Sequence, residues 1–384
     1  MNLEEVNEPN ESQKQNPEIE AQDLSVTPPQ EPVETSLEVS EEISDKTHET
    51  TNFSEAIPSA QAEWQRNQLD LAKVSQTADT IKDELQKVII GQDEIIELLL
   101  AALFAGGHVL IEGVPGIAKT LSAKLLSQTL RTDFARIQFT PDLMPTDVVG
   151  TNVFNLKTSE FSFNYGPIFS NIILIDEINR APAKTQAALF EVMEEYQVTV
   201  DGQTYPMEFP FFVLATQNPI EQEGTYKLPE AQLDRFLFKI NMSYPGLEEE
   251  KAILHRFKND FKIKIKDDVQ AVCSAEDIRT CQELIEKVHI KDELLDYIAN
   301  IIHNTRNNGD LFLGASPRAS LAILKAAKAI AAMSGRDFVT PDDIQRVAYP
   351  VLNHRVILTP EREMEGYDAK TVVNDIIKKI EVPR

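Results

Sequence analysis

One stretch constrains the fold more than any other part of the chain: Gly113-Val114-Pro115-Gly116-Ile117-Ala118-Lys119-Thr120. The apolar run Val109-Leu110-Ile111 leads into it, and a helical pattern starts near Lys119. In a strand–turn–helix unit of this kind, the backbone N–H groups of the turn surround phosphate oxygens, and the helix N-terminus adds a favourable dipole. In such a loop, Lys119 would reach the β- and γ-phosphates, and the Thr120 hydroxyl would hold Mg²⁺. The stretch therefore predicts a phosphate-binding loop.

This loop departs from the general pattern Gly-x-x-x-x-Gly-Lys-Ser/Thr at one position. Ala118 stands where the second glycine is usual. Alanine adopts the angles at which a helix starts, so the loop can close, but alanine does not tolerate the positive φ that glycine adopts. An ordinary junction between a strand and a helix is the alternative interpretation.

Two acids end a second apolar strand. Residues 171–176 (NIILID) are almost continuously apolar, as expected for a parallel strand that is buried on both faces. Parallel strands present their carboxyl ends at one edge of a sheet, where ligands bind. Because hard cations prefer carboxylate oxygens, Asp176 is expected to complete the Mg²⁺ shell, and Glu177 to polarise the attacking water. The alternative is an acidic strand end that simply faces solvent.

Three further polar residues are candidates for contact with the γ-phosphate. Asn218 follows the next strand, in Ala-Thr-Gln-Asn-Pro, where its amide could hold the lytic water, although an Asn before Pro is usually a turn. Arg235 and Arg318 each carry the fixed fork of donors that suits phosphate oxygens, and an arginine at the transition state accelerates hydrolysis. From the pattern alone, a surface salt bridge explains each arginine equally well.

Charge and composition set the first 60 residues apart. The chain has 37 basic and 62 acidic residues, a net charge of −25, which disfavours nucleic acid as a partner. Residues 1–60 are rich in Glu, Pro, Ser, Thr and Gln, and they contain too few apolar side chains to offset the entropy lost on ordering. We predict a disordered acidic tail that aids solubility, with a tether for a basic partner as the alternative.

Three other features favour a cytoplasmic protein. No basic and apolar leader opens the sequence, so secretion is not expected. The longest apolar stretch, residues 98–111, is too short and too interrupted to span a bilayer. Cys273 and Cys281 match neither a zinc motif nor a CxxC motif, and we expect no function for them.

Strand and helix patterns alternate up to about residue 242, which predicts a parallel sheet with helices on both faces. The expected strands are 109–111, 134–139, 171–176, 211–215 and 237–242, with short paired strands at 153–155 and 161–163 and a hairpin at 197–207 around Asp201-Gly202. The expected helices are 64–103, interrupted at 88–92, then 119 onward, 182–196 and 228–236, with a loop at 141–150. From Leu247 onward only helices are expected, at 247–258, 276–288, 291–305, 317–334, 341–353 and 368–380.

Five long motifs, taken together, resemble the MoxR family of AAA+ ATPases. The resemblance runs from about residue 70 to the C-terminus, and Ala118 is the residue that this family carries. The motifs are Gly-x-Pro-Gly-x-Ala-Lys-Thr, Leu-Ile-Asp-Glu-Ile-Asn-Arg-Ala-Pro, Ala-Thr-Gln-Asn-Pro, Glu-Gly-Thr-Tyr-x-Leu-Pro-Glu-Ala-Gln-Leu-Asp-Arg-Phe and Gly-Ala-Ser-Pro-Arg-Ala. The resemblance implies an α/β fold, a P-loop NTPase αβα sandwich with a parallel five-stranded sheet, followed by an all-α lid. We expect a tail over residues 1–60, a nucleotide-binding core over 61–265 and a helical lid over 266–384.

The same resemblance assigns roles to the candidate residues. Asn218 becomes sensor 1, Arg235 the arginine finger that acts on a neighbouring subunit, and Arg318 sensor 2, which reaches the nucleotide of its own chain. Lys119 and Thr120 become Walker A, and Asp176 and Glu177 Walker B, with Mg²⁺ held by Thr120 and Asp176. The ATP site is expected to consist of Ile90, Gly91, Gly113, Val114, Pro115, Gly116, Ile117, Ala118, Lys119, Thr120 and Leu121. Residues 141–166 match the helix-2 insert of this clade, and the hairpin at 197–207 matches the insert before sensor 1.

The implied function is that of an Mg²⁺-dependent ATPase that forms a homo-oligomeric ring, taken to be a hexamer, and remodels client proteins. Proteins with von Willebrand A domains are candidate clients. A chelatase-type motor for metal insertion is the first alternative. A nucleic-acid motor is disfavoured because residues 141–166 offer only Lys157 as a basic residue, and a scaffold that binds nucleotide without hydrolysis is disfavoured by the intact Glu177, Asn218 and Arg235.

Removal of residues 1–60 is expected to leave basal ATP hydrolysis and thermal melting nearly unchanged, because the segment has no core-forming residues. Calorimetry and phosphate release on the full and shortened chains test this. A melting temperature lowered by more than about 5 °C, roughly 1 kcal/mol for a domain of this kind, would show that the tail packs against the rest.

Overall fold

The computed structural model describes residues 60–114, 116, 119–157, 159–218, 225–258 and 268–383, and for residues 60–70 only the course of the helix. These residues belong to one compact unit, residues 57–384. The predicted boundary between core and lid, near residue 265, lies outside the described residues and stays a prediction, as does the tail.

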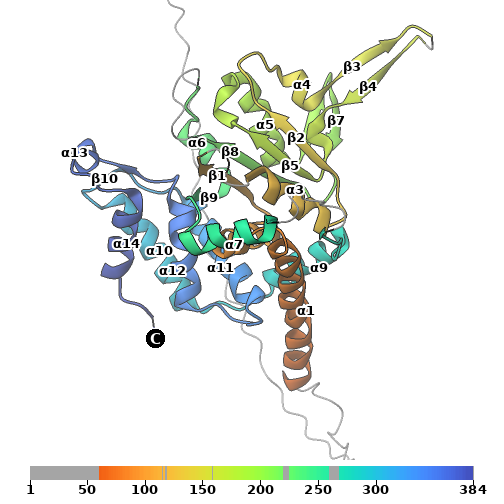
Figure 1. Ribbon diagram of the computed structural model, residues 1–384. Coiled ribbons are helices and arrows are strands. Elements are labelled where there is room, and N and C mark those ends of the chain that lie inside the picture. Colours follow the sequence, from red (N-terminus) through yellow and green to blue (C-terminus); the bar gives the residue numbers. More distant parts are fainter. Residues whose placement is uncertain are drawn as a thin grey trace, which may run out of the picture. The chain divides into compact units, whose positions relative to one another are not determined.

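A parallel sheet of five strands lies at the centre of the first half, as predicted (Figure 1). Its strand order is β2-β5-β8-β1-β9, and all four pairings are parallel. The strands are β1 (His108–Gly113), β2 (Phe134–Gln138), β5 (Ile172–Asp176), β8 (Phe212–Gln217) and β9 (Phe236–Met242). Every residue of β5 is buried, which explains why its sequence is almost continuously apolar.

Helices cover both faces of this sheet. Alternate side chains of the strands therefore pack in two different hydrophobic cores, one on each face. Val109 and Ile111 of β1 pack in one core, which extends into the C-terminal helices, whereas Leu110 packs in the other. The first core holds α1 (Ala60–Gln86), α2 (Asp93–Phe104) and α3 (Lys119–Thr129), and the second holds α5 (Ala183–Glu195). The two-sided burial confirms the predicted αβα layering.

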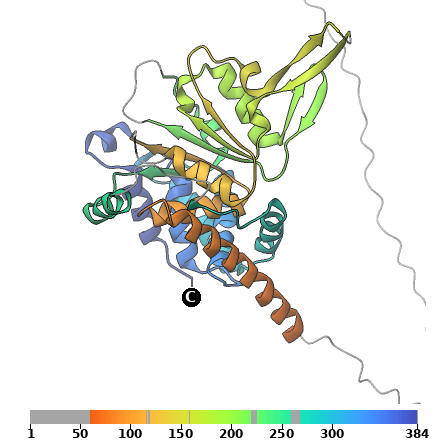
Figure 2. The ribbon, with the colours of Figure 1, turned by 45° about the vertical axis from the view of Figure 1, so that its right-hand side comes forward.

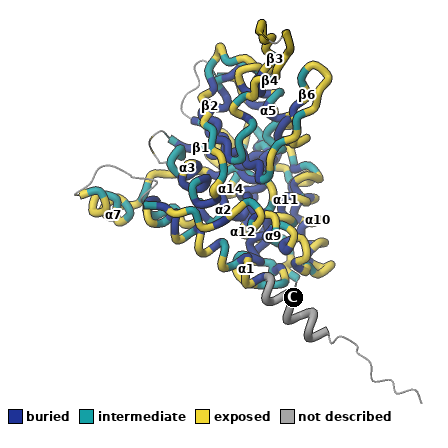
Figure 3. The backbone as a smooth tube through the Cα atoms, turned by 90° about the vertical axis from the view of Figure 1, so that its right-hand side faces the viewer, coloured by how far each residue is buried: buried dark blue, intermediate teal, exposed yellow. Residues whose placement is uncertain are grey.

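Two hairpins are inserted into this core. β3 (Gly150–Asn155) pairs with β4 (Glu160–Tyr165), and β6 (Gln197–Val200) pairs with β7 (Gln203–Pro206). The β3–β4 hairpin projects from the sheet and is largely exposed (Figures 2 and 3). The loop predicted over residues 141–150 was wrong in part, because it contains the short helix α4 (Pro145–Val149), whose Val148 and Val149 are buried.

The second half is mainly helical, as predicted, but it is not purely helical. β10 (Leu311–Leu313) and β11 (Ile357–Leu358) form a small antiparallel sheet that is too short to leave an alternating pattern in the sequence. The predicted helix 228–236 is only α6 (Glu230–Leu233), because Phe236 begins β9. The remaining elements are η1 (Pro167–Phe169), η2 (Ile178–Arg180), α7 (Leu247–Phe257), α9 (Ala275–Glu286), α10 (Asp292–Arg306), α11 (Pro317–Met333), α12 (Pro341–Leu352), α13 (Pro360–Met364) and α14 (Ala369–Lys379). In the described part of the chain, no helix is both long enough and apolar enough to cross a bilayer.

One buried arginine joins the C-terminal helices to the sheet. The Arg355 guanidinium, just after α12, pairs with the Asp234 carboxylate (Nε–Oδ1 2.6 Å) and donates to the Asp234 carbonyl (3.0 Å). It also donates to the carbonyls of Val351 (2.6 Å), Phe236 (2.6 Å) and Leu237 (3.1 Å). All the N–H donors of this guanidinium are therefore used, at a side chain that is 3% exposed.

Substitution of Arg355 by Met is expected to destabilise the fold by about 3–5 kcal/mol, because the Asp234 carboxylate would lose its buried counter-charge. Arg346→Ala is the matched control. Its ion pair with Glu97 involves an arginine that is 50% exposed, so a loss of only about 0–1 kcal/mol is expected. Urea unfolding of both variants measures the difference, and equal losses would contradict the assignment of Arg355 as the joining residue.

Candidate active site

The phosphate loop lies between β1 and α3, at the carboxyl edge of the sheet. Gly116 has φ 87°, in the left-handed region that favours glycine. The Lys119 ammonium donates to the Gly113 carbonyl (Nζ–O 2.7 Å), which fixes the side chain across the loop. Of the predicted loop residues, Gly113, Val114, Gly116, Lys119, Thr120 and Leu121 lie in the described part of the chain, whereas Pro115, Ile117 and Ala118 lie outside it.

The two acids lie at the same edge of the sheet, at the end of β5. Asp176 is buried, and its carboxylate accepts from Arg136 (Nε–Oδ2 2.6 Å) and from the Thr216 hydroxyl (Oγ1–Oδ1 3.2 Å). Thr216 also accepts from the backbone N–H of Glu177 (3.1 Å), so one hydroxyl fixes both acids. Asn218, which follows β8 directly, is buried as well. Since β5, β8 and β1 are adjacent, the acids, Asn218 and the loop come to one edge, as predicted.

Glu177 has an unusual backbone and two partners for its side chain. Its φ is 58°, which is uncommon for a residue other than glycine and costs energy that functional sites often store. Its Oε2 atom accepts from Gln138 (Nε2–Oε2 3.0 Å) and pairs with Arg180 (Nε–Oε2 2.8 Å). The carboxylate that is expected to act on water is therefore held by neighbouring side chains.

Four residues at this edge were not assigned a role from the sequence: Arg136, Gln138, Arg180 and Thr216. Two of them, Arg136 and Gln138, lie in β2, where a strand was predicted. β2 runs parallel to β5, and Gln138 pairs with Asp176, so polar residues at the end of β2 belong to the same edge. The position of a strand in the sheet cannot be taken from its pattern alone, which is why they were missed.

The segment expected to flank adenine connects α1 to α2. Gly91 has φ 71°, and a Cβ atom there would lie 2.5 Å from the Oε1 atom of Glu249 in α7. The segment that contains Ile90 and Gly91 is therefore in contact with the helix that follows β9.

Both candidate arginines lie at the opposite edge of the sheet, where the strands begin. Arg235 directly precedes β9, whose first residue pairs with His108 at the start of β1, whereas the loop follows Gly113 at the other end. At about 3.3 Å per residue, the length of β1 separates the two edges by roughly 16 Å. Arg235 and Arg318 share the carboxylate of Glu194 (Nη2–Oε2 2.8 Å and Nη2–Oε1 2.6 Å). Arg318 therefore lies beside Arg235 and away from the phosphate loop of its own chain, in contrast to the expectation that it reaches the nucleotide of that chain.

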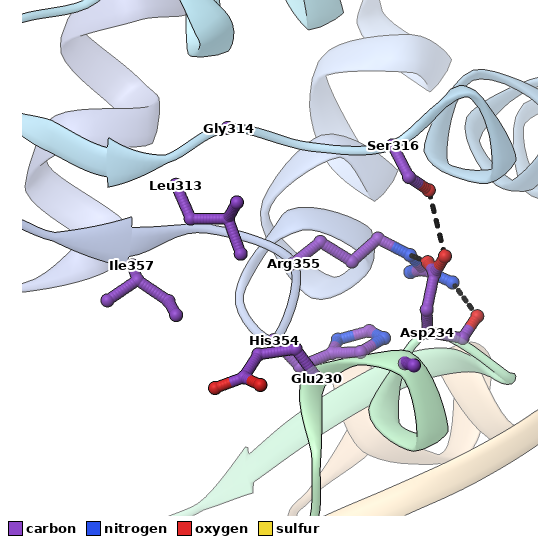
Figure 4. A pocket seen from close by; sticks show the side chains of 9 residues that line it. Glu230, Asp234, Leu313, Gly314, Ser316, His354, Arg355 and Ile357 are labelled. Carbon is purple, nitrogen blue, oxygen red and sulfur yellow. Dashed lines mark hydrogen bonds and ion pairs between the residues drawn. The ribbon is translucent and has the colours of Figure 1, made fainter. Parts of the chain in front are cut away.

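A pocket of about 200 Å³ lies next to these arginines, between the segment before β9 and the C-terminal half of the chain (Figure 4). Asp234 accepts from the Ser316 hydroxyl (Oγ–Oδ2 2.8 Å) as well as from Arg355. His354 lines the same pocket, and burial lowers its pKa well below the usual value, so the ring is neutral at pH 7. Its Nε2 atom lies 3.0 Å from the Phe236 carbonyl. Asp234, just before β9, is therefore hydrogen-bonded to Ser316, just before Arg318, and this bond joins the two segments.

Comparison with known proteins agrees with this geometry. Residues 108–238 match the family described as "ATPase family associated with various cellular activities (AAA)", and residues 303–376 match an AAA lid domain. The chain is 43% identical over 310 residues to Chaperone MoxR1 of Mycobacterium tuberculosis, which covers 78% of this chain and 81% of that protein. The chain belongs to the MoxR family of AAA+ ATPases. This family membership confirms the resemblance seen in the sequence and the predicted P-loop NTPase fold with a helical lid.

Two further similarities extend over most of the chain. It is 48% identical over 301 residues to the uncharacterised protein YeaC of Bacillus subtilis, covering 78% of this chain and 93% of that one. A solved structure of an ATPase candidate from Cytophaga hutchinsonii superposes with a TM-score of 0.77 at 42% identity, covering 84% of this chain and 99% of that one. The MoxR-family assignment therefore covers both the sheet and the C-terminal helices.

Proposed function

We propose that this MoxR-family chain hydrolyses ATP with Mg²⁺ and uses the turnover, within a ring of identical subunits, to remodel client proteins. The observation that carries the proposal is the meeting of the phosphate loop, Asp176, Glu177 and Asn218 at one edge of adjacent strands. A lysine in the loop, a buried carboxylate and a second carboxylate beside it are the parts that in-line attack of water on a γ-phosphate requires.

Each residue at this edge has a distinct role in the proposal. Lys119 binds the β- and γ-phosphates, and Asn218 orients the attacking water. Glu177 polarises that water and accepts its proton. Thr120 and Asp176 supply hydroxyl and carboxylate oxygens, a donor set that suits Mg²⁺, and the ion when bound neutralises charge on the phosphates.

The position of the arginines supports action between subunits. Arg235 and Arg318 lie at the far edge of the sheet from their own phosphate loop. We therefore assign both to the γ-phosphate bound by a neighbouring subunit, in a ring that we take to be a hexamer. An arginine supplied in this way stabilises the charge of the transition state.

The exposed side chains of the β3–β4 hairpin favour a protein client over nucleic acid. Phe154, Leu156 and Phe161 are 44%, 86% and 73% exposed. Exposed apolar side chains of this kind suit contact with other proteins, whereas nucleic acid requires clustered positive charge. Proteins with von Willebrand A domains are the client class that we propose, and the chaperone name of the Mycobacterium tuberculosis relative agrees with this role.

Two substitutions separate binding from chemistry. Lys119→Ala is expected to abolish ATP binding, because Lys119 contacts the ground-state phosphates. Glu177→Gln is expected to keep binding and to lose turnover by about 10²-fold or more, because Glu177 acts on water. Calorimetry and phosphate release measure the two effects, and normal turnover in Glu177→Gln would refute its assigned role.

Mixing of inactive variants tests the action between subunits. Arg235→Ala should bind ATP nearly normally and lose turnover by about 10³-fold, because the arginine acts on transition-state charge. Mixed with Lys119→Ala, it should recover partial activity, since some interfaces then combine an intact loop with an intact arginine. Arg318→Ala should behave in the same way. No recovery, in rings shown by native mass spectrometry to be mixed, would count against the arrangement.

A further inference from the structure

We propose that Glu194 is a positioning residue that holds Arg235 and Arg318 together and presents both to the phosphate bound by the next subunit. The proposal rests on the trans action described above. We call Glu194, Arg235 and Arg318 the arginine clasp. Each carboxylate oxygen of Glu194 takes one arginine, at 2.6 Å and 2.8 Å, so the two guanidinium groups are brought to a common point.

The end of α5 supplies the negative charge that such a pair needs. Two guanidinium groups that share one carboxylate repel each other, and an anion between them offsets this repulsion. Glu194 lies in the last turn of α5, where the helix dipole also favours cations. The Phe190 carbonyl of the same helix accepts from Arg235 as well. The helix end therefore stabilises an arrangement that the arginines alone would not adopt.

The arginine clasp has a net positive charge and lies beside a pocket with space for an anion. It carries two positive charges and one negative charge, and each guanidinium retains donors that Glu194 does not use. A pocket of about 200 Å³ at this position is lined by Arg235, Arg318, Lys325, Gly106 and Gly107. A phosphate group fits the chemistry of these residues because arginine forks bind its oxygens in pairs.

The clasp also joins the two halves of the chain. Arg235 precedes strand β9 of the sheet, whereas Arg318 lies in the first turn of α11 in the helical half. Their backbones are aligned by the bond from Ser316 to Asp234, and their side chains are aligned by Glu194 (Figure 4 shows Ser316 and Asp234). A rotation of the helical half that moves Ser316 away from Asp234 would also move Arg318 away from Glu194. The orientation of that half therefore determines whether a subunit offers one arginine or two to its neighbour.

Glu194→Gln tests the proposal, with Glu195→Gln as the control, because the adjacent exposed residue undergoes the same change of charge. In Glu194→Gln we expect kcat to fall about tenfold or more while KM for ATP changes less than about twofold, because ground-state contacts come from the subunit's own loop. Glu194→Asp, which keeps the charge, should retain more activity. Glu195→Gln should match the unchanged protein.

Mixing distinguishes a positioning role from a structural one. Glu194→Gln mixed with Lys119→Ala should recover turnover, because Lys119→Ala contributes an intact clasp and Glu194→Gln an intact loop. Unchanged or increased kcat in Glu194→Gln, a parallel rise in KM, or no recovery on mixing would each overturn the role of Glu194. If Arg235→Ala recovers with Lys119→Ala while Glu194→Gln behaves normally, only this inference fails. If Arg235→Ala does not recover, the trans arrangement itself fails.

Discussion

The parallel pairing of β1 with β8 and β9 is the constraint on which the rest of the structure depends. It aligns Gly113 with Met242 at one edge of the sheet and His108 with Phe236 at the other. The phosphate loop follows β1 at the first edge, the pairing of β8 with both β1 and β5 brings Asp176 and Glu177 to that edge, and Arg235 precedes β9 at the second edge. A shift of register would move the acids and the arginines relative to the loop at the same time, so the sheet fixes the chemistry as well as the fold.

Opposite charges are paired at both edges of the sheet. At one edge the carboxylates of Asp176 and Glu177 are paired with Arg136 and Arg180, and at the other the guanidinium groups of Arg235 and Arg318 are paired with Glu194. Glu177, Arg235 and Arg318, which are assigned to act on water or phosphate, are therefore each already oriented by an opposite charge. Such preorganisation reduces the rearrangement that remains when the reaction begins.

Much of this architecture could be predicted because the signals were local. The loop Gly113–Thr120, the apolar run that ends in Asp176 and the helical periodicities each depend on a few consecutive residues. The place of Arg318 could not be predicted, because it depends on how the helical half packs on the sheet, through the buried Arg355 and the bond from Ser316 to Asp234. For the same reason Arg136, Gln138 and Thr216 were missed, since only the order of the strands brings them to the acids.

The separation of the two edges has a consequence for how this chain would be regulated. If loop and arginines of one subunit cannot meet, an isolated subunit contains two half-sites and no complete one. Catalytic competence is then a matter of mass action: it appears as subunits associate and disappears on dilution, with every subunit still folded. A cell could thus set the activity of such a protein by its abundance alone, without a covalent modification or a dedicated inhibitor.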